Sequence, residues 1–353
     1  MIRKVFFGCN TVNGFHSFFD FLKNPADAKI FILKGGPGHG KSTLINSIAK
    51  EMIAKGYNIE LQFCSFDCNS LDALAVPSLK FAIVAATGHH VMDPKYPGVV
   101  EEIINLGEYL DIESILKYKD DIIALNNKIE RIFKRTYRYL KAAKLMAKNI
   151  EDINSTLQDF AKVNLLTKDI LDEIDREVAD HIGHERHLFA SAITPCGYIT
   201  HLDTLTKGNN IYKVLGDWGT GKTTLLKKVG EEAKIRGLNV EYYHHPLDPE
   251  KIEHLILPDI NMTLTTTNKT MNRECATYNL NDYLKDKRHI TEKEKMNELI
   301  NEAVKNLQKA KRLHDKMESY YTQNMNFEAI NKCQQRILRE IKKTRNPHNM
   351  KQN

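Results

Sequence analysis

The sequence predicts an α/β protein made of two similar halves. Short apolar runs are followed by a glycine-rich loop, an amphipathic stretch and another apolar run, and this order occurs twice along the chain. Strand, loop, helix and strand in that order indicate βαβ units and a mainly parallel sheet. Each half then continues into a long segment in which apolar residues recur at helical spacing.

The elements are expected in the same order in both halves. In the first half we expect strands at 5–7, 30–34, 58–66 and 81–87, a helix at 16–22, and a helix after the glycine-rich loop that ends near Gly56. The second half repeats this with strands at 188–190, 211–215, 239–247 and 261–267, a helix at 200–205, and a helix that ends near Gly237. Glycine is the residue most often found just past the end of a helix.

Matching positions show that the two halves are a tandem repeat. Lys222 follows Lys41 by 181 residues, and the same offset joins NIE at 58–60 to NVE at 239–241. Upstream, RKVF at 3–6 matches RHLF at 186–189, and further on NLGEYL at 105–110 matches NLNDYL at 279–284. Ordered matches over this length indicate an internal duplication.

The segments that follow each half are predicted to be helical. Residues 111–178 contain neither glycine nor proline and show apolar residues in heptad spacing. The second half turns helical from about 292 to 343, and YLKAAK at 139–144 resembles NLQKAK at 306–311. We therefore expect a first module at 1–111, a helical extension at 112–183, a second module at 184–286, and a helical extension with a basic tail at 287–353. The helices could pack on their own module, or project as an arm for self-association or a protein partner.

Composition limits the classes of protein to consider. The chain has 353 residues, 42% hydrophobic and 27% charged, which suits two globular domains, each with its own core. No apolar run approaches the roughly 18 residues of a membrane span, and the first residues lack the apolar run of a signal peptide. Six scattered cysteines do not form a dense disulfide framework. We expect a cytoplasmic protein without membrane contact. The net charge of +6 permits nucleic-acid binding but, without a clustered basic face, does not support it.

Two glycine-rich loops carry the chemistry. GGPGHGKST at 35–43 and GDWGTGKTT at 216–224 both match G-x-x-x-x-G-K-[ST], each after an apolar run and before a helix. Glycines let backbone N–H groups curl around a phosphate, the lysine reaches the β- and γ-phosphates, and the hydroxyl binds Mg²⁺. The expected cofactors are therefore ATP and Mg²⁺. The expected binding residues are Gly35, Gly36, Gly38, Gly40, Lys41, Ser42 and Thr43 in the first loop and Gly216, Gly219, Gly221, Lys222, Thr223 and Thr224 in the second.

Acidic residues for metal binding or catalysis are less clearly marked. Nucleotide hydrolysis needs an acid to hold Mg²⁺ and a group to orient water. The run FAIVAAT at 81–87 ends in alanines where such an acid would be expected, and NMTLTTT at 261–267 offers threonines. Asp67 and Asp248 directly end the strands after the loop helices and are predicted, with Ser42 and Thr223, as metal ligands. Asp72 and Glu253 are second candidates, and turn or helix capping is the alternative role for all four.

Four segments of the chain are distinctive: FILKGGPGHGKST, RHLFASAITPCG, LDPEKIEHLILP and FKRTYRYLKAAK. In these segments the chain resembles a family of uncharacterised bacterial proteins with duplicated P-loop modules, and this resemblance covers nearly the whole length. It implies tandem P-loop NTPase modules, each a three-layer αβα arrangement, with long helical extensions. It also implies ATP binding, in proteins described as ATPases or nucleotide kinases by inference from the loop.

Three functions are compatible with these features. The leading expectation is a P-loop NTPase with two Mg²⁺-ATP sites, in which hydrolysis couples nucleotide state to a partner or to assembly. A second is a kinase that transfers the γ-phosphoryl group to a small molecule or nucleotide, with Asp67 or Asp72 as general base. A third is a scaffold that binds nucleotide without hydrolysing it, which the missing strand-end acids favour.

Overall fold

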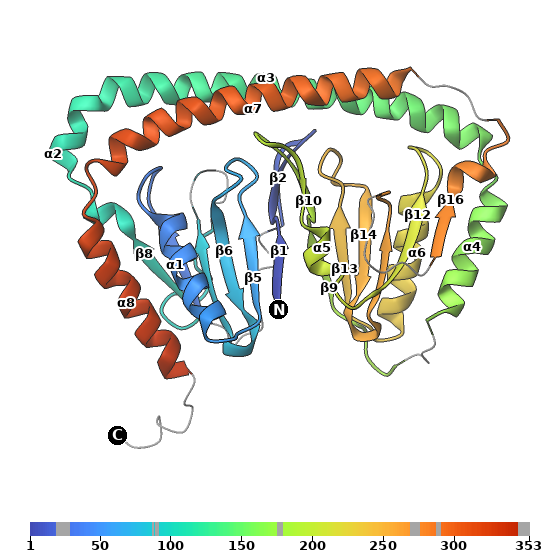
Figure 1. Ribbon diagram of the computed structural model, residues 1–353, viewed down its shortest axis with the longest axis horizontal. Coiled ribbons are helices and arrows are strands. Elements are labelled where there is room, and N and C mark those ends of the chain that lie inside the picture. The colour runs from blue at the N-terminus through green and yellow to red at the C-terminus, as the bar shows by residue number, and fades with distance from the viewer. Residues whose placement is uncertain are drawn as a thin grey trace. The chain divides into compact units, whose positions relative to one another are not determined.

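The computed structural model describes residues 1–18, 29–86, 88, 92–174, 179–268, 276–286 and 291–344. The chain divides into two compact units that are each discontinuous in sequence (Figure 1). The first unit contains Met1–Gly8, Leu22–Lys134 and Asn306–Asn353, and the second contains Cys9–Phe21 and Arg135–Lys305. Both units are mixed α/β, with helices packed on a sheet that contains parallel strands.

The sheet of the first unit has six strands in the order β1-β5-β6-β7-β4-β8. Its strands are β1 (Ile2–Val5), β4 (Lys29–Lys34), β5 (Ile59–Phe63), β6 (Leu71–Val76), β7 (Phe81–Ala85) and β8 (Glu101–Asn105). Strand β6 runs antiparallel to both neighbours, while β1 pairs with β5, and β4 with β7 and β8, in parallel. The sheet is therefore mainly parallel. Neighbouring residues of β4 are buried on both faces, as parallel strands in an α/β core require.

The sheet of the second unit repeats this order strand for strand. Its strands are β9 (Glu185–Leu188), β12 (Asn210–Leu215), β13 (Val240–His244), β14 (Ile252–Leu257), β15 (Met262–Thr265) and β16 (Ala276–Asn279), in the order β16-β12-β15-β14-β13-β9. Even the β-bulge recurs, at Phe63 in β5 and at His244 in β13. Each half also contains a two-stranded hairpin at the corresponding place. The first is β2 (Gly8–Thr11) with β3 (Gly14–Ser17), and the second is β10 (Ser191–Thr194) with β11 (Gly197–Thr200). The internal duplication predicted from the sequence is thus a duplication of structure.

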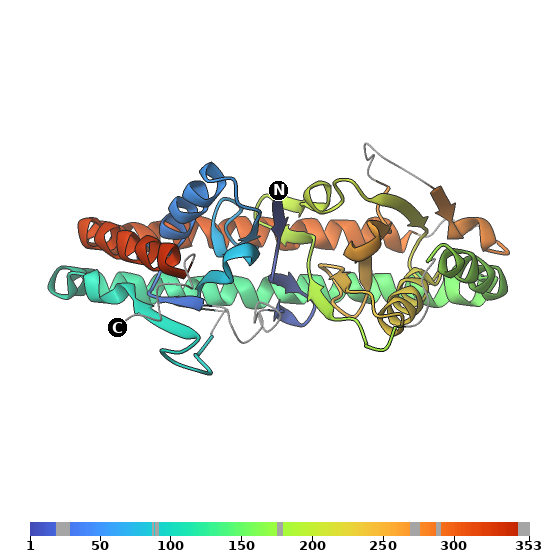
Figure 2. The same cartoon turned by 90° about the horizontal axis from the view of Figure 1, so that it is seen from below.

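Two helices pack on the sheet of the first unit and share its core. Helix α1 (Lys41–Ala54) follows β4, and α8 (Phe327–Thr344) lies beside α1 in both views (Figures 1 and 2). Helix α8 is strongly amphipathic, because its buried apolar residues recur every three or four positions. Those residues are Ile330, Cys333, Ile337, Leu338 and Ile341. The short helices η2 (Pro77–Leu79), η3 (Leu106–Tyr109), α2 (Ile112–Ile115) and η4 (Leu116–Tyr118) complete this unit, with the adjoining parts of α3 and α7.

The second unit has the same arrangement. Helix α6 (Lys222–Ile235) follows β12, and α4 (Phe160–Asp172) packs against it through Val163, Leu166 and Ile170. The short helices of this unit are α5 (Leu202–Leu205), η5 (Pro258–Ile260) and η6 (Leu280–Tyr283). Two long helices, α3 (Lys119–Leu157) and α7 (Glu292–Thr322), contribute residues to both units.

The helical extensions are exchanged between the halves of the sequence. Helix α4 follows the first sheet in the chain but belongs to the core of the second unit, and α8 follows the second sheet but belongs to the core of the first. This differs from both arrangements considered from the sequence, helices packed on their own module and a projecting arm. The long α3 and α7 allow the exchange, because about 1.5 Å of rise per residue makes helices of this length span roughly 45–60 Å.

One predicted element differs in type. The helix expected at 16–22 begins in a strand instead, since β3 runs from Gly14 to Ser17. The turn between β2 and β3 is closed by the Thr11 hydroxyl, which donates to the Gly14 carbonyl oxygen. The rest of that prediction, like the basic tail beyond residue 344, lies outside the described residues. Among the described residues no helix is both long and apolar enough to cross a membrane.

Candidate functional site

The first glycine-rich loop joins β4 to α1 and presents the start of the helix. Gly38 and Gly40 adopt left-handed backbone angles, with φ of 71° and 76°, that favour glycine. The N–H groups of the first helical turn have no partner within the helix, so they and the helix dipole attract an anion. The Lys41 ammonium donates to the carbonyl oxygens of Gly35 at 2.7 Å and Gly36 at 2.6 Å. The lysine therefore lies folded over the loop.

The second loop, between β12 and α6, has the same geometry. Gly219 and Gly221 have φ of 83° and 97°. The Lys222 ammonium donates to the carbonyl oxygens of Gly216 and Asp217, both at 2.6 Å. Two loops of one chain thus hold their glycines and their lysine in the same way. An anionic ligand with several oxygens could replace these carbonyl contacts of each lysine.

Burial lowers the pKa of both loop lysines to about 8. For Lys41, the nearby Glu318 and Asp72 carboxylates act in the opposite direction. For Lys222, Asp217 also acts to raise the pKa, while the ammonium groups of Lys251 and Lys293 add to the lowering. An ammonium group that is partly desolvated gains more from a bound anion than one in water does.

Each loop is covered by helices from the other half of the sequence. A Cβ atom at Gly38 would lie 2.7 Å from the Glu318 carbonyl oxygen of α7, and one at Gly219 would lie 2.4 Å from the Glu151 carbonyl oxygen of α3. Glycine is therefore required at both positions for packing as well as for its backbone angles. The residues that face the last glycine of each loop also correspond, Phe327 and Ile330 in the first unit and Phe160 and Val163 in the second.

In the second unit, the end of α3 is hydrogen-bonded to the outer side of the loop. The Asn154 amide donates to the Trp218 carbonyl oxygen at 2.7 Å, and the Gln158 amide donates to the Thr220 carbonyl oxygen at 3.2 Å. These two bonds fix loop carbonyl groups and use no loop N–H group, while the N–H of Asp217 donates to the Asn281 side chain at 3.0 Å. Asn154 and Gln158 are not marked by any sequence motif, so sequence reasoning missed them.

Asp67 and Asp248, predicted as metal ligands, are both paired with lysines of the covering helices. The Lys311 ammonium of α7 lies 3.2 Å from the Asp67 carboxylate, and the Lys144 ammonium of α3 forms an ion pair with Asp248. Lys144 and Lys311 are the last residues of the two similar segments YLKAAK and NLQKAK. Each Asp also accepts from a backbone N–H two residues on, of Asn69 and Glu250 respectively. The geometry of both residues is that of a turn anchored to a helix.

Asp72 and Glu253 lie closer to the loops. Asp72 is buried at the start of β6, where the N–H of the preceding Leu71 donates to the Ser42 hydroxyl at 2.8 Å. Glu253 is buried at the same position of β14 and accepts from the Tyr198 hydroxyl at 2.5 Å. Burial acts to raise the pKa of Glu253, but His254, His245 and the Tyr198 hydroxyl outweigh it and hold the pKa at about 2.

A cavity of about 530 Å³ opens beside the second loop. Its walls include the loop itself, the Glu253 carboxylate, and two lysines that the sequence did not single out, Lys251 and Lys293. Lys251 forms an ion pair with Glu151 of α3, and Lys293 forms one with Asp217 at 2.6 Å. Cavities of this size hold small organic ligands. The lining offers ammonium groups, carboxylates and hydroxyls, which suits a polyanion with a cation.

Trp218 also lines this cavity. Its indole ring meets the His245 ring edge-to-face at 5.2 Å, and the Lys144 ammonium lies 5.4 Å from the ring centre. The side chain therefore fills space between the loop and α3.

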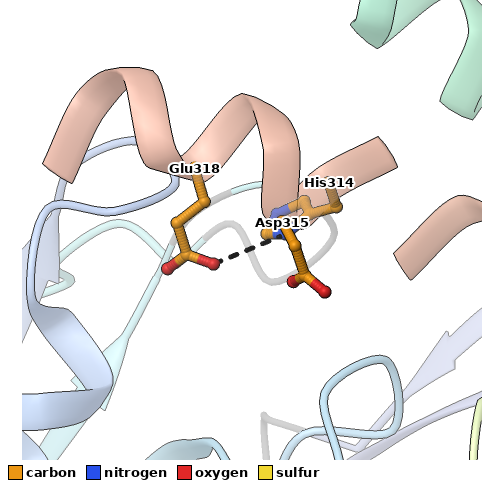
Figure 3. Close-up of side chains that lie close together, drawn as sticks. All are labelled: His314, Asp315 and Glu318. Carbon is orange, nitrogen blue, oxygen red and sulfur yellow. Dashed lines mark ion pairs between the residues drawn. The ribbon is translucent and has the colours of Figure 1, made fainter. Parts of the chain in front are cut away.

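One further group of side chains has the composition of a metal site. His314, Asp315 and Glu318 of α7 bring one possible ligand atom each within 4.8 Å of one another (Figure 3). Lys311, however, already forms an ion pair with Asp315, and the His314 ring lies 3.8 Å from the Glu318 carboxylate. Because an ammonium group competes for the same carboxylate, the cluster is explained as part of the ion-pair network that joins α7 to Asp67.

Comparison with known proteins gives one match. The family model described as "Nephrocystin 3, N-terminal" matches residues 9–81, which include the first glycine-rich loop, α1 and Asp72. No curated protein and no solved structure matches the chain. The matched segment is about a fifth of the chain and contains nothing of the second half. The resemblance to bacterial proteins with duplicated P-loops remains a prediction.

Proposed function

We propose that the protein binds ATP at both glycine-rich loops and acts as an Mg²⁺-dependent ATPase with tandem P-loop modules. One observation carries the proposal. Both loops combine left-handed glycines, a helix N-terminus and a lysine folded over the loop, and the pattern G-x-x-x-x-G-K-[ST] is complete in each. This combination suits the β- and γ-phosphates of a nucleoside triphosphate.

The residues around the loops also suit Mg²⁺. Hydroxyl and carboxylate oxygens are the ligands that Mg²⁺ prefers, and it usually takes one or two carboxylates together with substrate phosphates. Ser42 with Asp72, and Thr223 with Glu253, would supply them. When bound, the ion would offset negative charge on the phosphates. Asp67 and Asp248 suit the role less well, because lysines of α7 and α3 already neutralise them.

Counting bound nucleotide tests this proposal. Titration calorimetry with ATP and Mg²⁺ should give two sites in the wild type, one in Lys41→Ala and one in Lys222→Ala, and none in the double variant. Phosphate release should accompany binding in the wild type. A wild type that binds no ATP, or a double variant that binds it normally, would refute the proposal.

A scaffold that binds nucleotide without hydrolysing it is the second candidate. On one side, β4 and β12 pair with β7 and β15, and these strands end in Ala85 and Thr265 rather than in an acid. Two bound ATP molecules without phosphate release would select the scaffold. Turnover that appears only when a small acceptor is added would instead indicate a kinase.

A further inference from the structure

We propose that the two sites differ in activity, and that Lys251 is the cause. In the second site Lys251 binds the terminal phosphate and supports turnover, whereas the first site, which has Ser70 at the same position, holds ATP with much slower turnover. This inference rests on the proposed function, since it assigns hydrolysis to one of its two sites.

Ser70 and Lys251 occupy equivalent places in the backbone. The N–H of Cys64 donates to the Ser70 carbonyl at 3.0 Å, and the N–H of His245 donates to the Lys251 carbonyl at 2.9 Å. The N–H groups of Ser70 and Lys251 in turn donate to the carbonyls of Asp67 and Asp248, at 2.9 and 3.0 Å. The turn between the two strands is thus the same in both units. At this position of the turn the side chains differ, a short hydroxyl in the first unit and an ammonium group in the second.

Lys251 lies at the second site. Lys251 lines the cavity together with Lys222 and Glu253, and its charge contributes to lowering the pKa of Lys222. Its partner is Glu151 of α3, whose backbone covers the loop at Gly219. The ion pair neutralises Lys251 and keeps its ammonium group beside the loop. A phosphate in the cavity would give this ammonium group a second anionic partner.

In the part of the chain that the structure describes, no lysine forms an ion pair with the corresponding acid of the first site. Glu318 of α7 covers Gly38 as Glu151 covers Gly219, but its carboxylate lies 3.8 Å from the ring of His314. The pKa of His314 is lowered from its usual value, chiefly by burial, so this ring is mostly neutral at pH 7 and above. Both halves of the repeat therefore have the acid that covers the loop, and in the second half a lysine, Lys251, forms an ion pair with it.

A cation at this position acts on the transition state of hydrolysis. A bond forms between the water oxygen and the terminal phosphorus while the bond to the bridging oxygen breaks; ADP leaves with that electron pair, and the proton of water passes to phosphate and solvent. Negative charge grows on the oxygens around the breaking bond, and a side-chain cation there raises turnover about 10³- to 10⁵-fold in enzymes of this reaction class. Lys251 would stabilise that charge without transferring a proton.

Single-site variants test the inference. Lys41→Ala leaves the second site and Lys222→Ala leaves the first, and ATP binding by each is checked by calorimetry before turnover is compared. We expect turnover of Lys222→Ala to be at least 100-fold below that of Lys41→Ala. Adding Lys251→Ser to Lys41→Ala should lower the rate of phosphate release about 100- to 1,000-fold and change the dissociation constant of ATP less than tenfold. Lys251→Arg should restore most of the rate.

A matched control and several contrary outcomes complete the test. Lys305→Ser removes an exposed lysine that is also paired with an acid, Glu302, and should leave turnover unchanged. Equal turnover by the two single-site variants, or no effect of Lys251→Ser on the rate, would overturn the inference while the proposed function stands. Absence of ATP binding by the wild type would overturn the proposed function itself. A Lys251→Ser variant that loses binding as strongly as turnover would show that Lys251 contributes only to affinity, and would also overturn the inference.

Discussion

The carboxylate of Glu253 is buried and yet charged. Its oxygens lie near the His254 ring and accept from Tyr198, and these contacts outweigh the effect of burial on its pKa. Glu253 therefore places a fixed negative charge in the wall of the cavity that Lys222 and Thr223 also line. The charge of Asp248, in contrast, is neutralised by its ion pair with Lys144. At the scale of single residues, these two acids are suited to different tasks.

Replacing each acid by its amide separates those tasks. Glu253→Gln keeps the shape of the side chain but removes the charge, so we expect Mg²⁺-dependent phosphate release from the second site to fall about 100-fold or more, with ATP still bound. Asp248→Asn should lower turnover less than tenfold and reduce stability instead. Both are measured in Lys41→Ala, in which only the second loop is intact. Turnover lost in Asp248→Asn and kept in Glu253→Gln would reverse the assignment.

The lowered pKa of the loop lysines predicts how ATP affinity depends on pH. Below about pH 8 each lysine is charged before ATP arrives, so affinity should change little from pH 7 to 8. Above pH 8 the free lysine loses its proton, because burial lowers the pKa of Lys41 and Lys222 to about 8, and binding must restore it. The dissociation constant should rise about tenfold per pH unit between pH 8 and 10. Calorimetry in buffers of different ionisation enthalpy should show proton uptake there. A constant affinity from pH 7 to 10 would contradict this prediction.

At the scale of elements, α3 and α7 hold the turns after β13 and β5 in place through ion pairs. Lys144 pairs with Asp248 and Lys311 pairs with Asp67. Each lysine lies seven residues before the acid of the same helix whose backbone covers the loop. The two ion pairs differ in exposure. The side chain of Asp248 is 3% exposed and that of Asp67 is 27% exposed, while the two lysines are similarly half-buried.

This difference predicts unequal costs for removing the lysines. Lys144→Ala leaves a buried carboxylate without its counter-charge and should lower the free energy of unfolding by about 3–5 kcal/mol. Lys311→Ala leaves a carboxylate that water can reach and should cost about 1 kcal/mol or less. Urea denaturation followed by circular dichroism measures both. Adding Asp248→Ala to Lys144→Ala should recover part of the loss, and equal losses in the two single variants would contradict the argument.

At the scale of the whole molecule, the repeat could be predicted from sequence and the exchange of helices could not. Matching positions such as Lys41 with Lys222 fixed the correspondence of strands, and the apolar spacing of α3, α4, α7 and α8 marked them as helices. Both extensions carry similar apolar faces, however, and both cores offer similar surfaces. An apolar pattern specifies that a face is buried but not against which of two like partners. Lys251 could not be predicted as a site residue either, because it matches no motif and only the fold brings it to the cavity that Lys222 lines.

The exchange predicts that neither half folds alone. A fragment of residues 1–183 would contain the first sheet and α1 but not α8, whose Ile330, Cys333, Ile337, Leu338 and Ile341 are buried in that core. Burial of such side chains contributes about 1.5–3 kcal/mol each, so their loss, on the order of 10 kcal/mol, matches the whole stability of a typical domain, about 5–15 kcal/mol. We expect fragments 1–183 and 184–353 to be insoluble or unfolded when expressed separately, and to form a folded one-to-one complex when expressed together. Gel filtration and circular dichroism distinguish these results. Cooperative unfolding of the isolated 1–183 fragment would show that α8 is dispensable for the first core, which its buried residues argue against.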